Sequence, residues 1–302
     1  MLKLITTLIL LFSFANSAKI TPSEVYGQVM LIEDEVHYLL EYYDIKHNHT
    51  ETEKVVEITT KLKPRNVWQK TYEIMIKINI LRAQHNLPRI EPINMPPVAH
   101  LNPDLVYEQT QRVLTELRIF ETRMQITVPK YKLTKYKHKT PLDVFNALNY
   151  ISLTLDELNK HKVTPSYVFG ENMRVYDDIA LILNSLNIKD NVTPFSKNKE
   201  STPNDTANTA LRILEKVKQL QILAGIEYID FIQFRKAKQT PSDVFSLTQM
   251  IIAELQTIKA YLSIKNITPA SNRYKAKTPT EVDQLMEWNL RKLNLINKLN
   301  RM

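Results

Sequence analysis

A short phrase centred on Thr-Pro recurs along this chain and constrains its fold more than any other feature. It reads YKHKTPLDVF at 136–145, RKAKQTPSDVF at 235–245 and YKAKTPTEVD at 274–283. A Thr or Asn oxygen can cap a helix by accepting a free backbone N–H, and proline costs nothing at the first helical position, where its missing N–H would be unpaired anyway. The phrase therefore predicts eight helix starts, at Pro22, Pro64, Pro103, Pro141, Pro165, Pro203, Pro241 and Pro279.

Acidic residues strengthen five of these predicted starts. A carboxylate two residues after the proline can reach back to the cap, and it favours the positive end of the helix dipole. Such residues are Glu24, Asp143, Asp205, Asp243 and Glu281.

Apolar residues follow each start with the period of a packed helix. With the proline as position 1, they favour positions 4, 8, 11, 15, 18 and 22, and Ile or Leu stands 23 residues after six of the eight prolines. Alternating steps of four and three are typical of helices in bundles. Each unit is therefore expected to hold a helix of about 24 residues, about 36 Å long. Asn172 and Asn289 also fall on this seam, where a buried Asn can fix helix register.

The spacing of the starts predicts an all-α fold in two halves. Linkers separate most of the helices, but HKVTPSYVF leads directly from the fourth helix to the fifth. We therefore predict eight tandem-repeat helices in two four-helix, bundle-like halves or a short α-solenoid, with a signal peptide at 1–18 and the halves at 19–164 and 165–302. A linker of about 14 extended residues reaches about 46–50 Å, so parallel and up-and-down helix orders both remain open.

The first 18 residues, MLKLITTLILLFSFANSA, are typical of a secretory signal peptide, with cleavage after Ser17 or Ala18. An uncleaved N-terminal anchor is the alternative. The chain contains no Cys, whereas secreted animal proteins of this size usually carry disulfides. We therefore expect a bacterial protein that is periplasmic or secreted.

The basic residues suggest the kind of partner. The 302-residue chain has a formal net charge of +8, which favours anionic lipid, polysaccharide or acidic protein. Its cations gather beside aromatic residues just before helix starts, where a cation opposes the helix dipole. We predict that these linkers bind anions, helped by free helix N–H groups; an ordinary solvated surface is the alternative. The predicted residues are Lys130, Lys132, Lys135, Lys137, Lys139, Arg235, Lys236, Lys238, Arg273, Lys275 and Lys277.

No motif in the sequence predicts catalysis. Three Gly cannot supply a phosphate-binding loop, and a Gly-x-Ser-x-Gly elbow is missing, so we predict neither an enzyme nor a cofactor. The segment KHNHTETE at 46–53 holds His47 and His49, but it lacks the spacing of a zinc site, so no metal is predicted.

These features together predict an exported binding or scaffolding protein. Its basic linkers would contact an anionic envelope component or an acidic protein rather than nucleic acid, and peripheral membrane contact and self-association fit the same pattern. One alternative is a small-molecule sensor or carrier with its ligand in a bundle core. Another is an exported effector or toxin.

Overall fold

The computed structural model describes residues 19–46, 61–160, 163–194, 196–197, 199–297 and 299. Over these residues the protein is all-α and contains no strand, which confirms the predicted fold class. The predicted signal peptide and the two histidines of the His-rich segment lie outside the described residues.

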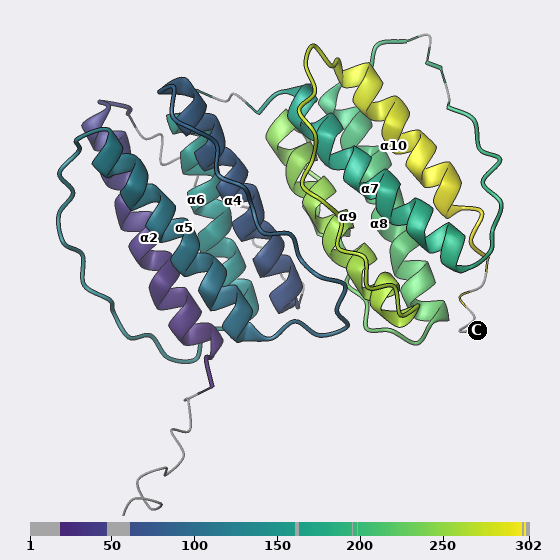
Figure 1. Cartoon of the computed structure of the whole chain (residues 1–302), viewed down its shortest axis with the longest axis horizontal. Coiled ribbons are helices and arrows are strands. Elements are labelled where there is room, and N and C mark those ends of the chain that lie inside the picture. Colours follow the sequence, from purple (N-terminus) through teal and green to yellow (C-terminus); the bar gives the residue numbers. More distant parts are fainter. Residues whose placement is uncertain are drawn as a thin grey trace, which may run out of the picture.

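Each half of the chain forms a four-helix bundle with the same packing (Figure 1). The first contains α2 (Pro22–Tyr42), α4 (Pro64–Gln84), α5 (Pro103–Arg123) and α6 (Pro141–Leu158). The second contains α7 (Pro165–Ser185), α8 (Pro203–Leu223), α9 (Pro241–Tyr261) and α10 (Pro279–Leu293), with a short 3-10 helix, η1 (Ile232–Phe234), before α9. In each bundle the first two helices both pack against the last two, so the first two occupy one diagonal.

All four helices of a bundle point the same way. The prolines that begin α2, α4, α5 and α6 surround one small pit, together with the valines three residues further on. The prolines that begin α7, α8, α9 and α10 surround a second pit. Four helix N-termini therefore meet at one end of each bundle, and the linkers run back along the helices (Figure 1). Of the two helix orders that linker length allows, the structure has the parallel one.

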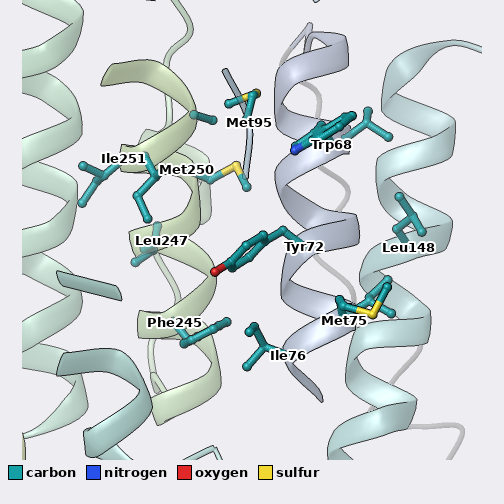
Figure 2. Close-up of a cluster of buried hydrophobic side chains, with 14 of the residues drawn as sticks. Trp68, Tyr72, Met75, Ile76, Met95, Leu148, Phe245, Leu247, Met250 and Ile251 are labelled. Atoms are coloured by element: carbon teal, nitrogen blue, oxygen red, sulfur yellow. The ribbon is translucent and has the colours of Figure 1, made fainter. Parts of the chain in front are cut away.

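Helices α4 and α9 join the two halves and lie antiparallel to each other. Near the start of α4, Arg65 bonds to Glu254 in the second half of α9, whereas Lys77, further along α4, bonds to Ser242 at the start of α9. The two bundles therefore point in opposite directions (Figure 1). Figure 2 shows the apolar part of this contact, in which Tyr72 extends from α4 towards α9.

The predicted helix starts have the predicted chemistry. At α6, Thr140 Oγ1 accepts a hydrogen bond from Asp143 N at 3.2 Å, and Asp143 Oδ2 accepts one from Thr140 N at 2.7 Å. The same reciprocal pair forms at the starts of α8, α9 and α10, whereas at α2 only the Glu24 carboxylate accepts from Thr21 N, at 2.6 Å. Each pair satisfies two backbone or hydroxyl groups that a helix start would otherwise leave unpaired.

The helices are shorter than the predicted 24 residues, because each unit also contains the turn that ends its helix. Helices α2, α4, α5, α7, α8 and α9 have 21 residues, α6 has 18 and α10 has 15. After α2, Asp44 takes a φ of 50°, and Ile45 N then donates to Leu40 O at 2.9 Å. This is a Schellman motif, in which an apolar residue follows the left-handed one. The recurrent Ile or Leu is that apolar residue.

The seam predicted from the apolar period is buried. In α9, Val244, Ile251, Leu255 and Ile258 are each at most 2% exposed. The two seam asparagines lie in contact, because Asn289 Nδ2 donates to Asn172 O at 3.1 Å. A hydrogen bond between α7 and α10 at one level of the bundle suits the predicted role in register.

The linker before the fourth helix of each half docks on the first helix in the same way. Lys139 N donates to Ser23 Oγ at 3.0 Å, and Lys277 N donates to Ser166 Oγ at 3.0 Å. The two hydrogen bonds occupy equivalent positions in the two halves, so the linker path is part of the repeat.

A glycine lies beneath each of these docked linkers. Gly27 is the sixth residue of α2, and Gly170 is the sixth residue of α7. A Cβ on Gly27 would stand 2.8 Å from the carbonyl oxygen of Thr134, and one on Gly170 would stand 2.5 Å from Ser271 Oγ. Real Cβ atoms do not approach so closely, so glycine allows the linker to lie against the helix.

Candidate anion-binding groove

A buried ion pair fixes how the two halves sit against each other. Arg65 Nε and Nη2 each donate to a different oxygen of Glu254 at 2.9 Å, and the two side chains are 4% and 1% exposed. Asn66 and Gln221 also donate to this carboxylate, at 2.9 and 2.8 Å. Charges this deeply buried are tolerated only when they are paired and hydrogen-bonded.

A second buried cluster continues the contact towards the other end of α4. Lys70 Nζ lies 2.8 Å from Glu73 Oε2, and Lys77 Nζ lies 2.8 Å from Asp156 Oδ2. Burial opposes ionisation of Glu73, but the two lysines lower its pKa to about 2. Ser242 of α9 donates to Asp156 Oδ2 at 2.6 Å and so ties the second half to this cluster. Of the two clusters, this second one lies nearer the groove, because Lys77 follows the groove residue Ile76 on α4.

That groove has a volume of about 610 Å³ and takes residues from both halves. The first half supplies the last turns of α4 and the residues just after it. The second half supplies the start of α7 and the linker that leads to α10. Its lining residues in the described chain include no Asp or Glu; they are Ile76, Asn79, Ala83, Leu87, Arg89, Thr164, Ser166, Tyr167, Ser271, Asn272, Arg273, Tyr274, Lys275, Ala276 and Lys277.

Four of these lining residues are cationic. Lys277 is held by its own half, because its Nζ lies 2.6 Å from Glu281 Oε1 and 4.5 Å from the centre of the Phe169 ring. Arg89, Arg273 and Lys275 form no ion pair with any residue that the structure describes. Three like charges therefore share one hollow without a counterion from the described chain.

Hydrogen bonds fix both segments that carry these cations. Asn79 Nδ2 donates to Ile90 O at 2.8 Å, and Asn79 Oδ1 accepts from Ile90 N at 2.8 Å, which anchors the residue next to Arg89. On the other side, Arg174 Nε donates to Pro269 O at 2.9 Å, at the beginning of the linker that carries Arg273. The groove walls are thus anchored to α4 and α7.

The helix that begins in the groove lacks the acidic cap found at five other helices. Thr164 at the N-cap of α7 makes no side-chain cap hydrogen bond, and the first turn contains no acidic residue. Tyr167 stands where α2, α6, α8, α9 and α10 have Asp or Glu. The positive end of this helix is therefore not offset by its own sequence, and it favours an anion.

The predicted basic residues do not form one surface. The linker that carries Lys130, Lys132, Lys135, Lys137 and Lys139 docks on α2 of the first half. The segment with Arg235, Lys236 and Lys238 lies beside α8, and the one with Arg273, Lys275 and Lys277 lies on α7. Only this last group enters the groove.

Two other predicted cations are also held by partners in their own half. Lys139 Nζ lies 4.2 Å from the centre of the Tyr26 ring, and Lys236 Nζ lies 2.5 Å from Asp243 Oδ1. The prediction for Lys139, Lys236 and Lys277 rests on the cost of placing a cation near the positive end of a helix dipole. In the structure, an acidic or aromatic partner in the same half offsets this cost for each of the three.

Two residues of the groove were missed from the sequence. Arg89 is an isolated cation in its linker, and nothing near it in the sequence indicates that it meets the second half. Tyr167 carries a weak signal, because five of the eight helix-starting prolines have an acid two positions later and Tyr167 does not, but Asn66 and Leu105 lack the acid as well.

Comparison with protein families, with curated proteins and with solved structures finds no match to this chain. In the part of the chain that the structure describes, no helix has the length and apolar character needed to cross a membrane. The same residues bring together no group of three or more His, Cys, Asp or Glu that could hold a metal ion. The groove is therefore the basis on which a function can be assigned.

Proposed function

We propose that this chain is an exported binding protein, periplasmic or secreted, that takes an anionic group in the groove between its halves. The ligand would be part of an anionic envelope component or an acidic protein. The main support is the groove lining, which has four cationic residues and no acidic one. Cations and the positive end of a helix dipole together favour anion binding.

The composition of the groove suits binding better than chemistry. Its lining residues include no His, Asp or Glu, the residue types that most often act as general bases. They do include hydroxyl, amide, guanidinium and ammonium groups, which donate hydrogen bonds to an anion.

The size of the groove favours a second function, that of a small-molecule sensor or carrier. A volume of about 610 Å³ falls in the range of roughly 300–1,000 Å³ that small-molecule sites occupy. The pits on the two bundle axes offer only about 20 Å³ each and are lined mainly by Pro and Val. A small ligand would therefore bind between the halves rather than in a bundle core.

Co-sedimentation of residues 19–302 with envelope fractions of the producing cell tests the proposal. Association should weaken between about 0.05 and 0.5 M salt, as the Debye length falls from about 14 to about 4 Å. It should be lost in a groove variant and kept in a control that removes the same charge from the linker on α2. The groove variant is Arg89→Gln/Arg273→Gln/Lys275→Gln, and the control is Lys130→Gln/Lys132→Gln/Lys137→Gln.

Two results would contradict the proposal. Association that the groove variant retains in full would show that the groove is not the contact. Association lost only in the control would place the contact on the linker that docks on α2.

A further inference from the structure

We infer that the groove takes a phosphate monoester, a group with two negative charges, on a ligand with an apolar body. This inference rests on the proposed function and names the chemical class of its ligand. It follows from the number of unpaired cations, from their placement on two sides of the groove and from the apolar residues beside them.

The number of charges favours a dianion over a monoanion. Arg89, Arg273 and Lys275 lack an ion pair within the described chain, and the start of α7 adds a partial positive charge. A carboxylate or a sulfate ester brings one negative charge and leaves most of this repulsion in place. A phosphate monoester brings about −1.5 to −2 charges at neutral pH.

The placement of the donors favours three acceptor oxygens over two. Arg89 belongs to the first half, whereas Arg273, Lys275 and the first turn of α7 belong to the second, so donors come from two sides of the groove. The three terminal oxygens of a phosphate monoester point in different directions and can accept from both sides. Guanidinium groups also match phosphate oxygens in bidentate pairs.

The remaining wall of the groove suits an apolar body. Ile76 and Ala83 from α4 and Leu87 just after it line the side that the first half contributes. The rings of Tyr167 and Tyr274 line the side of the second half. A phosphate group at the start of α7 would leave the rest of the ligand among these residues, where burial of apolar surface adds affinity.

Isothermal titration calorimetry tests the inference with three probes, each of which carries six carbon atoms in a straight chain. Hexyl phosphate, hexyl sulfate and hexanoate differ in head-group charge and shape. At pH 7.5 and low salt, hexyl phosphate should bind at least about tenfold more tightly than either other probe. At pH 5, below the second phosphate pKa of about 6, its affinity should fall towards that of hexyl sulfate.

A matched pair of variants places this binding in the groove. Arg273→Gln/Lys275→Gln should weaken binding of hexyl phosphate at least about tenfold, because it removes two charge-assisted donors. Lys132→Gln/Lys137→Gln removes the same charge from exposed residues of the linker on α2 and should leave the affinity unchanged. Arg273 and Lys275 are both exposed, so their replacement should not unfold the protein.

Vesicles distinguish a lipid source from a soluble one. One set of phosphatidylcholine vesicles contains phosphatidic acid, a phosphate monoester, and the other contains phosphatidylglycerol, a monoanionic diester. Co-sedimentation with the first set but not with the second supports a lipid ligand. Binding of hexyl phosphate without vesicle binding supports a soluble ligand.

The experiments distinguish failure of this inference from failure of the proposed function. If hexyl sulfate or hexanoate binds as tightly as hexyl phosphate, the inference is wrong and the proposed function stands. If neither the probes nor the vesicles bind, the inference is also wrong, and the envelope co-sedimentation decides the proposed function separately.

Discussion

The contact between the halves should depend strongly on one buried carboxylate, that of Glu254. It accepts four hydrogen bonds, two from Arg65 at 2.9 Å and one each from Asn66 and Gln221 at 2.9 and 2.8 Å. Glu254→Gln replaces one acceptor oxygen with an NH₂ group that faces other donors. It also leaves Arg65, which is 3% exposed, without a counterion.

The expected loss is large because the remaining charge stays buried. Removal of one partner of a buried ion pair typically costs about 3–5 kcal/mol. A native domain is stable by only about 5–15 kcal/mol, so this is a substantial fraction of the total. Arg65→Met/Glu254→Gln removes the unpaired charge, but its one amide oxygen can accept from only one of Asn66 and Gln221, which donate to different oxygens of Glu254. We expect the double variant to recover part of the loss.

Urea unfolding followed by far-UV circular dichroism measures this difference, and a second ion pair between the halves supplies the control. Lys63 and Glu227 also pair across the contact, but their side chains are 31% and 44% exposed. Because exposed pairs contribute only about 0–1 kcal/mol, Glu227→Gln should cost at most about 1 kcal/mol. The reasoning fails if Glu254→Gln costs no more than Glu227→Gln, or if the double variant is no more stable than Glu254→Gln.

Two further variants test the linker packing and a buried acid. Gly170→Ala should lower the free energy of unfolding by about 1–3 kcal/mol, because the new Cβ would overpack the linker, even though Ala favours helix. In urea unfolding, adding Ser271→Gly should recover part of this loss. A single variant more stable than the natural chain would contradict the prediction. Burial and the neighbouring Glu35 raise the pKa of Glu121 from 4.5 to about 8, so the folded state holds the extra proton and stability falls as pH rises between these values. In melting curves from pH 6 to 9, Glu121→Gln should reduce this fall and the exposed control Glu108→Gln should not; equal slopes in both variants would refute the assignment.

The helices could be predicted from the sequence because their starts depend on neighbouring residues. Thr140, Pro141 and Asp143 lie within four positions, so their cap is visible without knowledge of the fold. Six of the eight helices end three residues before the predicted end, because the apolar residue of the Schellman motif continues the apolar pattern past the helix; α6 and α10 end earlier still. The sequence leaves helix direction open, since the linkers are long enough for either order.

The groove could be predicted only in part. The cations of one wall, Arg273 and Lys275, were singled out, but so were eight basic residues that lie on other linkers. The opposite wall, with Arg89, depends on the antiparallel contact between α4 and α9, which brings together residues far apart in the sequence. Buried polar pairs such as Arg65 and Glu254 create that contact, and one sequence does not reveal which charges pair.

Calorimetric titration of Tyr167→Glu with hexyl phosphate tests most directly whether the start of α7 and its neighbouring cations form an anion site. The variant places a carboxylate where five other helices carry one, so it should stabilise α7 by about 0.3–1 kcal/mol. The same carboxylate should compete for the cations of the groove, so Tyr167→Glu should bind at least about tenfold more weakly than the neutral Tyr167→Gln, which loses the same aromatic ring. A stabilised Tyr167→Glu that binds hexyl phosphate with unchanged affinity would contradict the account.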